Sequence, residues 1–179
     1  GRGGYSGYSD FGDGQGYGTT RSTLDLGNGD NTLSILGSGE TYGRREAYGI
    51  GYGASQTGIK AGNGDDSISI TGSAVAFGGQ RETFGESISH GLNQSSVETG
   101  RGEDSLAIAS DTQGGTSSKS YGVRRSRIDT GQGNDSFSIR NSAMTGSSSG
   151  ASIAAQGIVR SEIHLGQGRD TLDITSGAS

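Results

Sequence analysis

The chain has 179 residues, of which 37 are Gly and none is Pro or Cys, and only 27% of them are hydrophobic. Without Cys it has neither disulfides nor thiolate metal sites, and a net charge of −5 gives it no basic surface for nucleic acid. No apolar stretch approaches the roughly 20 residues that a membrane helix needs, so we expect no membrane insertion.

The first segment, residues 1–16, is rich in Gly, Tyr and Ser and lacks the pattern that repeats in the rest of the chain. Two interpretations are open: a flexible lead-in, or a degenerate edge rung that covers the first strand. The second is favoured because Tyr5, Tyr8 and Phe11 have the size to pack on a neighbouring strand. We therefore separate this segment from a repeat domain over residues 17–179.

The repeat domain contains five copies of a two-part motif. The first part begins with a glycine column formed by Gly18, Gly53, Gly91, Gly122 and Gly157. Six residues later stands an aliphatic column formed by Leu24, Ile59, Val97, Ile128 and Ile163. The apolar parity changes between the two columns, near Arg21 and its equivalents, which indicates a corner or a bulge at this position.

The second part is a loop with the sequence GxGx followed by Asp or Asn, after which apolar residues alternate with mostly Ser. Its copies lie at residues 24–35, 59–70, 97–108, 128–139 and 163–174. The first glycines of successive loops are 35, 38, 31 and 35 residues apart. Alternation with period two indicates strands, and a repeat of this length indicates a solenoid.

We therefore predict an all-β fold, a parallel β-solenoid of about five coils with one coil per repeat of about 35 residues. In this arrangement Ile35 lies beside Ile70, whereas two shorter coils per repeat would separate them. The segments of variable length between the repeats are expected to form a third side of each coil and a surface turn. No 3.6-residue period appears, so we expect no helix.

The loops resemble the repeats-in-toxin family, whose glycine-rich motif forms a calcium-binding parallel β-roll. Gly62, Gly64, Asp66 and Ile68 match the motif, and the other four loops match at the same positions. The resemblance implies calcium bound between successive loops. The oxygen ligands that it implies are Asp66, Asp104, Asp135, Asp170, Asn31, Asp30 and Asp65.

The loops also depart from that family. Leu26, Ala61, Thr99, Thr130 and Leu165 replace its first glycine, and the repeat is much longer. Arg101 and Arg169 place positive charge in two loops. The alternative to calcium is a hydrogen-bonded corner, in which the glycines adopt positive φ and the Asp side chains accept backbone N–H groups.

Two other sets of polar residues follow the repeat. Arg21, Arg125 and Arg160 share a column with Gln56 and Gln94, for which we expect guanidinium-to-amide hydrogen bonds on a solvated face rather than a sugar or phosphate site. His90 and His164 occupy different positions in the repeat, so we expect surface residues rather than a metal site.

The repeat favours a structural or adhesive module of a secreted or cell-surface bacterial protein, which is not an enzyme. Self-association end to end, a polysaccharide and a cell surface are its expected partners. The alternative is a carbohydrate-active β-helix enzyme, a polysaccharide lyase or hydrolase, in which Asp25, Glu98 and Asp129 would supply carboxylates. Release of unsaturated or reducing ends from polysaccharides would distinguish the two.

Overall fold

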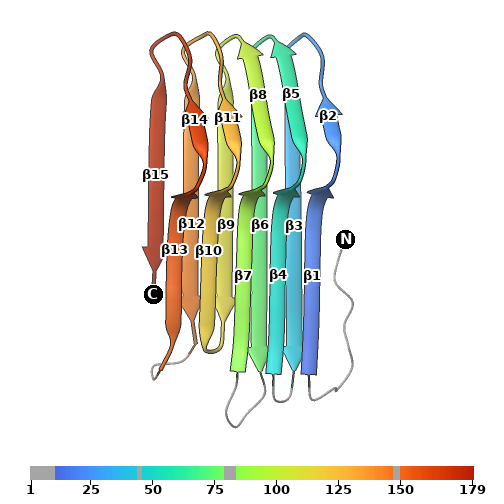
Figure 1. Ribbon diagram of the computed structural model, residues 1–179, viewed down its shortest axis with the longest axis vertical. Helices are drawn as coiled ribbons and strands as arrows, with labels where there is room; N and C mark the ends of the chain where they lie inside the picture. Colours follow the sequence, from blue (N-terminus) through green and yellow to red (C-terminus); the bar gives the residue numbers. More distant parts are fainter. Residues whose placement is uncertain (1–10, 44–45, 79–83, 147–149) are drawn as a thin grey trace.

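A computed structural model of the protein describes residues 11–43, 46–78, 84–146 and 150–179. Over these residues the chain forms 15 β-strands in three parallel sheets and no helix (Figure 1), which confirms the predicted β-solenoid. No helix long and apolar enough to cross a membrane occurs in these ranges. The first strand begins at Phe11 and so crosses the expected boundary at residue 17, while residues 1–10 lie outside the described residues.

Each sheet takes one strand from each repeat. Sheet A contains β1 (Phe11–Thr20), β4 (Glu46–Ser55), β7 (Phe84–Asn93), β10 (Ser117–Arg124) and β13 (Ser152–Val159). Sheet B contains β2 (Thr23–Asp25), β5 (Gly58–Asn63), β8 (Ser96–Arg101), β11 (Arg127–Asp129) and β14 (Glu162–His164). Sheet C contains β3 (Thr32–Gly43), β6 (Ser67–Gly78), β9 (Ser105–Gly114), β12 (Ser136–Thr145) and β15 (Thr171–Ala178).

Each coil is flattened into two long sides. The strands of sheets A and B run in the same direction along one side, and the strand of sheet C returns along the other (Figure 1). The glycine-rich loops make the turn between sheets B and C at one end of the flattened coil. The variable segments between the repeats supply the remainder of sheet C and the beginning of sheet A, so they lengthen the two long sides instead of forming the expected third side. The expected turn is described between β9 and β10, at residues 115–116.

The register is the one that the aligned repeats predict. Ile35 pairs with Ile70, Ile70 with Ile108, Ile108 with Ile139 and Ile139 with Ile174, all in parallel strands. One coil per repeat is therefore confirmed, and the alternative of two shorter coils is excluded. Identical or similar side chains stack directly on one another along the axis of the solenoid.

The apolar core occupies the half of each coil next to the glycine-rich loops. Its fully buried side chains come from the predicted aliphatic columns and include Ile59, Ile70, Val97, Leu106, Ile128, Phe137 and Ile139. Burial of one such side chain contributes roughly 1.5–3 kcal/mol. The alternation with period two therefore predicts correctly which side chains point inward in sheets B and C near the loops.

The other half of each coil is closed by backbone and by small side chains rather than by large apolar ones. A Cβ atom built on Gly16 would lie 1.7 Å from the carbonyl oxygen of Ser38, and one on Gly51 would lie 1.7 Å from that of Ser73. Sheets A and C therefore approach so closely there that only glycine fits. In the later coils Ser hydroxyls fill this space, and the Oγ atoms of Ser89 and Ser110 are 2.6 Å apart. This explains how 27% hydrophobic residues suffice.

Candidate functional site

The loop between sheets B and C is built on two glycines with positive φ. Gly27 has φ 80° and Gly29 has φ 105°, and both glycines of each other loop also have positive φ. A Cβ atom on Gly62 would lie 2.1 Å from the carbonyl oxygen of Gly27, so neighbouring loops also touch through their backbones. The pattern GxG thus serves both turn geometry and close stacking.

The structure brings five of the predicted ligand positions into one column. Each Asp accepts, at Oδ1, the backbone N–H of its counterpart in the preceding coil. The four donor–acceptor distances are 2.9 Å for Asn31 to Asp66, 2.8 Å for Asp66 to Asp104, 3.0 Å for Asp104 to Asp135 and 3.0 Å for Asp135 to Asp170. Asn31 begins the column and donates its Nδ2 to Asp66 Oδ1 at 3.0 Å.

The remaining two predicted ligands, Asp30 and Asp65, lie in a neighbouring exposed column. There the direction is reversed, because the N–H of Asp65 donates to Asp30 Oδ1 at 3.0 Å and the N–H of Glu103 donates to Asp65 Oδ1 at 2.8 Å. The two groups of carboxylates thus accept hydrogen bonds from separate sets of backbone N–H groups. Side chains satisfy the backbone of the loops in both directions along the solenoid.

The geometry of the loops is that of a hydrogen-bonded corner. Every Oδ1 atom of the buried column accepts a backbone N–H, and among the described residues no three His, Asp or Glu side chains form a group suited to a metal ion. The Oδ2 atoms of Asp66, Asp104 and Asp135 are buried without a hydrogen-bond donor from the described residues. Burial raises the pKa of Asp104, and the carboxylates of Asp135 and Asp66 raise it further, while hydrogen bonds from Thr99 and Asp66 lower it.

The column yields a first testable prediction. Replacing Asp104 by Ala leaves the buried N–H of Asp66 without its acceptor and should cost about 1–3 kcal/mol of unfolding free energy. Asp104→Asn retains Oδ1 and replaces the unpartnered Oδ2 by a donor, as Asn31 does in the same column, so it should be at least as stable as the wild type. Urea unfolding at neutral pH with chelator measures both. Equal stability of the Ala and Asn variants would contradict the role of Oδ1.

The corner between sheets A and B has an unusual backbone. Arg21, Gln56, Gln94, Arg125 and Arg160 all have φ between 49° and 52°. For residues other than Gly this left-handed conformation costs roughly 1–2 kcal/mol each. Backbone hydrogen bonds to the next coil hold it, such as Arg21 N to Ser55 O at 3.0 Å and Gln56 N to Asn93 O at 2.9 Å. The predicted corner is therefore confirmed at Arg21 and its equivalents.

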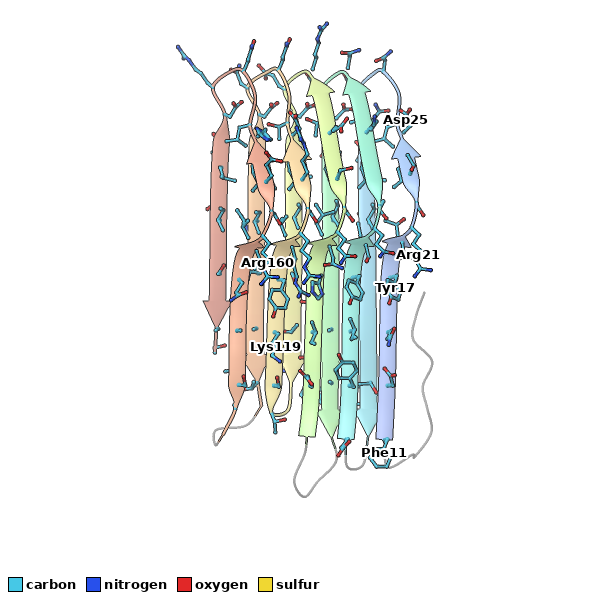
Figure 2. All side chains as sticks on the ribbon, in the orientation of Figure 1. Phe11, Tyr17, Arg21, Asp25, Lys119 and Arg160 are labelled. Atoms are coloured by element: carbon cyan, nitrogen blue, oxygen red, sulfur yellow. The ribbon has the colours of Figure 1, made fainter. Side chains whose placement is uncertain are left out.

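The side chains of this corner row, defined as Arg21, Gln56, Gln94, Arg125 and Arg160, point outward along the solenoid, and Figure 2 shows Arg21 and Arg160 at its two ends. Arg21 Nε donates to Gln56 Oε1 at 3.0 Å, and Gln56 Nε2 donates to Gln94 Oε1 at 3.2 Å. One expected guanidinium-to-amide bond is thus confirmed, between the first two coils, and an amide-to-amide bond continues the row to the third coil. The row also borders an open groove, lined in part by Gln94, Arg125 and Arg160.

The floor of the groove is a ladder of hydroxyl groups. Thr57 Oγ1 donates to Ser55 O at 3.0 Å, while the N–H of Thr57 donates to Ser95 Oγ at 3.0 Å. The same two bonds recur in the following coils, at Ser95 and Ser126. Because these hydroxyls are committed to the backbone, the polar groups left for a ligand are those of the corner row and of Ser96, Arg127 and Glu162.

A second row of side chains lies beside the corner on the outer face of sheet A. Tyr17, Tyr52, His90 and Tyr121 stack with ring centroids 5.0, 4.8 and 5.0 Å apart and interplanar angles of 6°, 13° and 22°. Their ring faces therefore cover one another and their edges face outward. The repeats show this signal in the sequence, since Tyr or His stands directly before the conserved Gly in four of the five copies.

His90 corrects an expectation from the sequence. It was expected at the surface, but only 2% of it is exposed, because the rings of Tyr52 and Tyr121 cover both of its faces. Its Nε2 lies 3.2 Å from Nη1 of Arg124. Burial and, to a smaller extent, the Arg124 charge lower the pKa of His90 to about 3. The ring is therefore neutral at pH 7 and accepts a hydrogen bond from the guanidinium.

The carboxylates considered for the enzyme alternative stand in a column on sheet B. Lys60 lies between Asp25 and Glu98 in this column, and its Nζ is 3.7 Å from Glu98 Oε2. At the last coil His164 Nε2 is 2.8 Å from Glu162 Oε1. Glu98 thus forms an ion pair with Lys60 of the preceding coil, and Glu162 accepts a hydrogen bond from His164.

Comparison with protein families, with curated proteins and with solved structures found no match for this chain.

Proposed function

We propose that this protein is a structural and adhesive module of a secreted or cell-surface bacterial protein, which extends by stacking coil on coil. The observation that carries the proposal is the continuous register of five equivalent coils, in which the same columns pass from the first strand of each sheet to the last. Such an array transmits the same contacts along its whole axis.

The two ends of the array present uncovered core. In the last coil Leu172 and Ile174 are 41% and 44% exposed, whereas their neighbours in the same columns, Phe137 and Ile139, are 1% and 0% exposed. In the first coil Leu33 and Leu24 are only partly buried. A second copy placed with its first coil on the last coil of this one would continue every column. Such a head-to-tail contact does not close and gives filaments.

This proposal predicts reversible association that increases with concentration. The sedimentation coefficient of the 179-residue chain should rise with protein concentration, and Leu172→Lys should prevent the rise by placing a charge in the end contact. Ser105→Lys is a matched control, because Ser105 is exposed on β9, the middle strand of sheet C. Circular dichroism should show the same strand content in all three proteins. A strictly monomeric wild type would exclude the end-to-end contact. It would favour the alternative that further repeats of a longer chain cover the terminal faces.

Calcium stabilisation is a second proposal, which is favoured by the three unpartnered Oδ2 atoms of the buried column. Carboxylate oxygens are the ligands that calcium prefers, and an ion would supply the positive charge that these buried atoms lack. Asp66, Asp104 and Asp135 are the residues that would hold it. Asn31 is less suited, because its Nδ2 donates to Gly29 O at 2.6 Å.

Calorimetric titration of chelator-treated protein tests this second proposal. We expect heat of binding and a higher melting temperature at millimolar calcium, both of which the triple variant Asp66→Asn, Asp104→Asn, Asp135→Asn should lack. The triple variant Asp13→Asn, Asp25→Asn, Asp173→Asn removes the same charge from exposed positions that are not among the predicted ligands and should keep the response. No heat and an unchanged melting temperature in the wild type would leave the loops as hydrogen-bonded corners.

A further inference from the structure

We propose that the groove beside the corner row binds a linear anionic polysaccharide, whose carboxylate or sulfate groups contact the guanidinium groups of Arg125 and Arg160. The groove has a volume of about 870 Å³ and extends over the second to fifth coils, from Gln56 to Arg160. This inference rests on the adhesive part of the proposed function and gives it a ligand class. The end-to-end contact does not depend on it.

The part of the corner row that borders the groove offers hydrogen-bond donors without partners among the described residues. Gln94 uses its Oε1 for Gln56, so its amide Nε2 remains for a ligand. Within the described part of the chain neither Arg125 nor Arg160 has a carboxylate within ion-pair distance. Arginine has only donors, and its planar fork matches a carboxylate or a sulfate. The ligand must therefore supply acceptors, and negative charge is favoured.

The charge of the groove is opposite to that of the chain. The whole protein carries a net charge of −5, yet the groove lining includes Arg125, Arg127 and Arg160 and one acid, Glu162. Arg127 is already paired, at 3.7 Å from Asp129 and at 3.7 Å from Glu162. The two unpaired guanidinium groups thus give this groove a local positive field on an acidic molecule.

The choice of residues in the corner row also points to a ligand. The chain uses Gly at 11 other described positions with positive φ, where Gly is free of strain. At all five corners it keeps Arg or Gln instead, although the conformation is unfavourable for them. Strained polar residues that face a groove are typical of binding sites. The fold alone needs only a residue that tolerates positive φ.

The shape of the groove favours a polymer. It follows the axis of the solenoid, so its polar groups repeat at about the spacing of neighbouring strands, roughly 4.8 Å. A linear glycan lying along it places successive sugar residues over successive coils and contacts Gln94, Arg125 and Arg160 together. A single-stranded nucleic acid is disfavoured, because it needs exposed aromatic faces, whereas the rings of Tyr52, His90 and Tyr121 cover one another.

Affinity electrophoresis of the full 179-residue chain tests the proposal. Polygalacturonate provides carboxylates, dextran sulfate provides sulfates, and unmodified dextran and single-stranded DNA complete the panel. We expect the wild type to be retarded by one or both anionic glycans and not by dextran. The double variant Arg125→Gln, Arg160→Gln should lower the affinity about tenfold or more, as the loss of charge-assisted hydrogen bonds implies. Gln already adopts this corner conformation at Gln56 and Gln94, so the variant should fold.

The matched control is Arg140→Gln with Arg169→Gln, which removes the same charge from exposed positions outside the groove. Its affinity should fall less than about twofold, because exposed distant charges are screened. Arg125→Lys with Arg160→Lys should bind with intermediate affinity, because Lys keeps the charge and loses the fork. Equal losses in the Gln and control variants, tighter binding of DNA than of glycan, or no binding by the wild type would each overturn the proposal. Sedimentation of the Gln variant should match the wild type, which separates a failure of this inference from a failure of end-to-end stacking.

Discussion

Replacing Gly51 by Ala should lower the free energy of unfolding by about 3 kcal/mol or more, the upper range for an overpacked site. A Cβ atom at this position would lie 1.7 Å from the carbonyl oxygen of Ser73, and backbone cannot move aside as a flexible side chain does. Sheets A and C would have to separate over several coils. Urea unfolding measures the loss as a lower midpoint.

Gly58→Ala is the matched control for this prediction. Gly58 also lies in a strand, but a Cβ atom there has Ser96 Oγ, at 3.6 Å, as its nearest neighbour. This variant should change the unfolding free energy by less than about 1 kcal/mol, with stabilisation favoured because Ala restricts the unfolded chain. Ser89, which pairs with Gly51 in the next coil, is buried beside Ser110 where the sheets leave more room. A loss at Gly58 as large as that at Gly51 would contradict the close approach of the two backbones.

Acidification should destabilise the protein through His90. Its pKa is lowered to about 3 in the folded state from an ordinary value of 6.5. Between these values the unfolded chain binds a proton that the folded chain does not, so stability from this group is complete above pH 6.5 and falls as the pH decreases toward 3. The full shift corresponds to a loss of about 5 kcal/mol. Urea unfolding across this pH range measures the slope.

The variant His90→Tyr isolates this effect. Tyr occupies the equivalent position at Tyr17, Tyr52 and Tyr121, so the substitution extends the stack and removes the titrating ring. The variant should lose less stability than the wild type on acidification, while carboxylates contribute equally in both. If the wild type and His90→Tyr lost stability equally as the pH decreases, the pKa of His90 would not be lowered in the folded protein.

The aligned columns were sufficient to predict the class of fold, the number of coils, the register and the position of the corner. They succeed because a solenoid places equivalent residues directly beside one another, so that Ile35 and Ile70 must be neighbours once the repeats are aligned. The change of parity at Arg21 gave the corner for the same reason. What the columns did not predict was the side-chain orientation in the first part of the sheet A strands. In β4 the inward residues are Gly49, Gly51 and Gly53, while Ile50 and Tyr52 face outward.

Hydrophobic alternation misleads there because the contact is made by backbone, for which glycine carries no apolar signal. The burial of His90 was missed for a related reason, since stacking between coils buries a polar ring on an outward face. The sequence identified the corner row but not the groove beside it. Whether a surface is hollowed into a groove depends on the strands that lie on both of its sides. The sequence resemblance of the loops predicted that Asp66, Asp104 and Asp135 share a column, and the structure adds that Oδ1 of each is already bonded.

The closure of half of each coil by backbone also affects how the protein responds to temperature. The heat-capacity change of unfolding grows with the apolar surface that becomes hydrated and is reduced by polar surface. Gly16, Gly51 and their partners in sheet C bury carbonyl and amide groups where a globular protein buries hydrocarbon. The heat-capacity change per residue should therefore be smaller than in a globular domain of equal length. Its curve of stability against temperature is accordingly flatter, so that cooling weakens the fold less than it weakens one held together mainly by an apolar core.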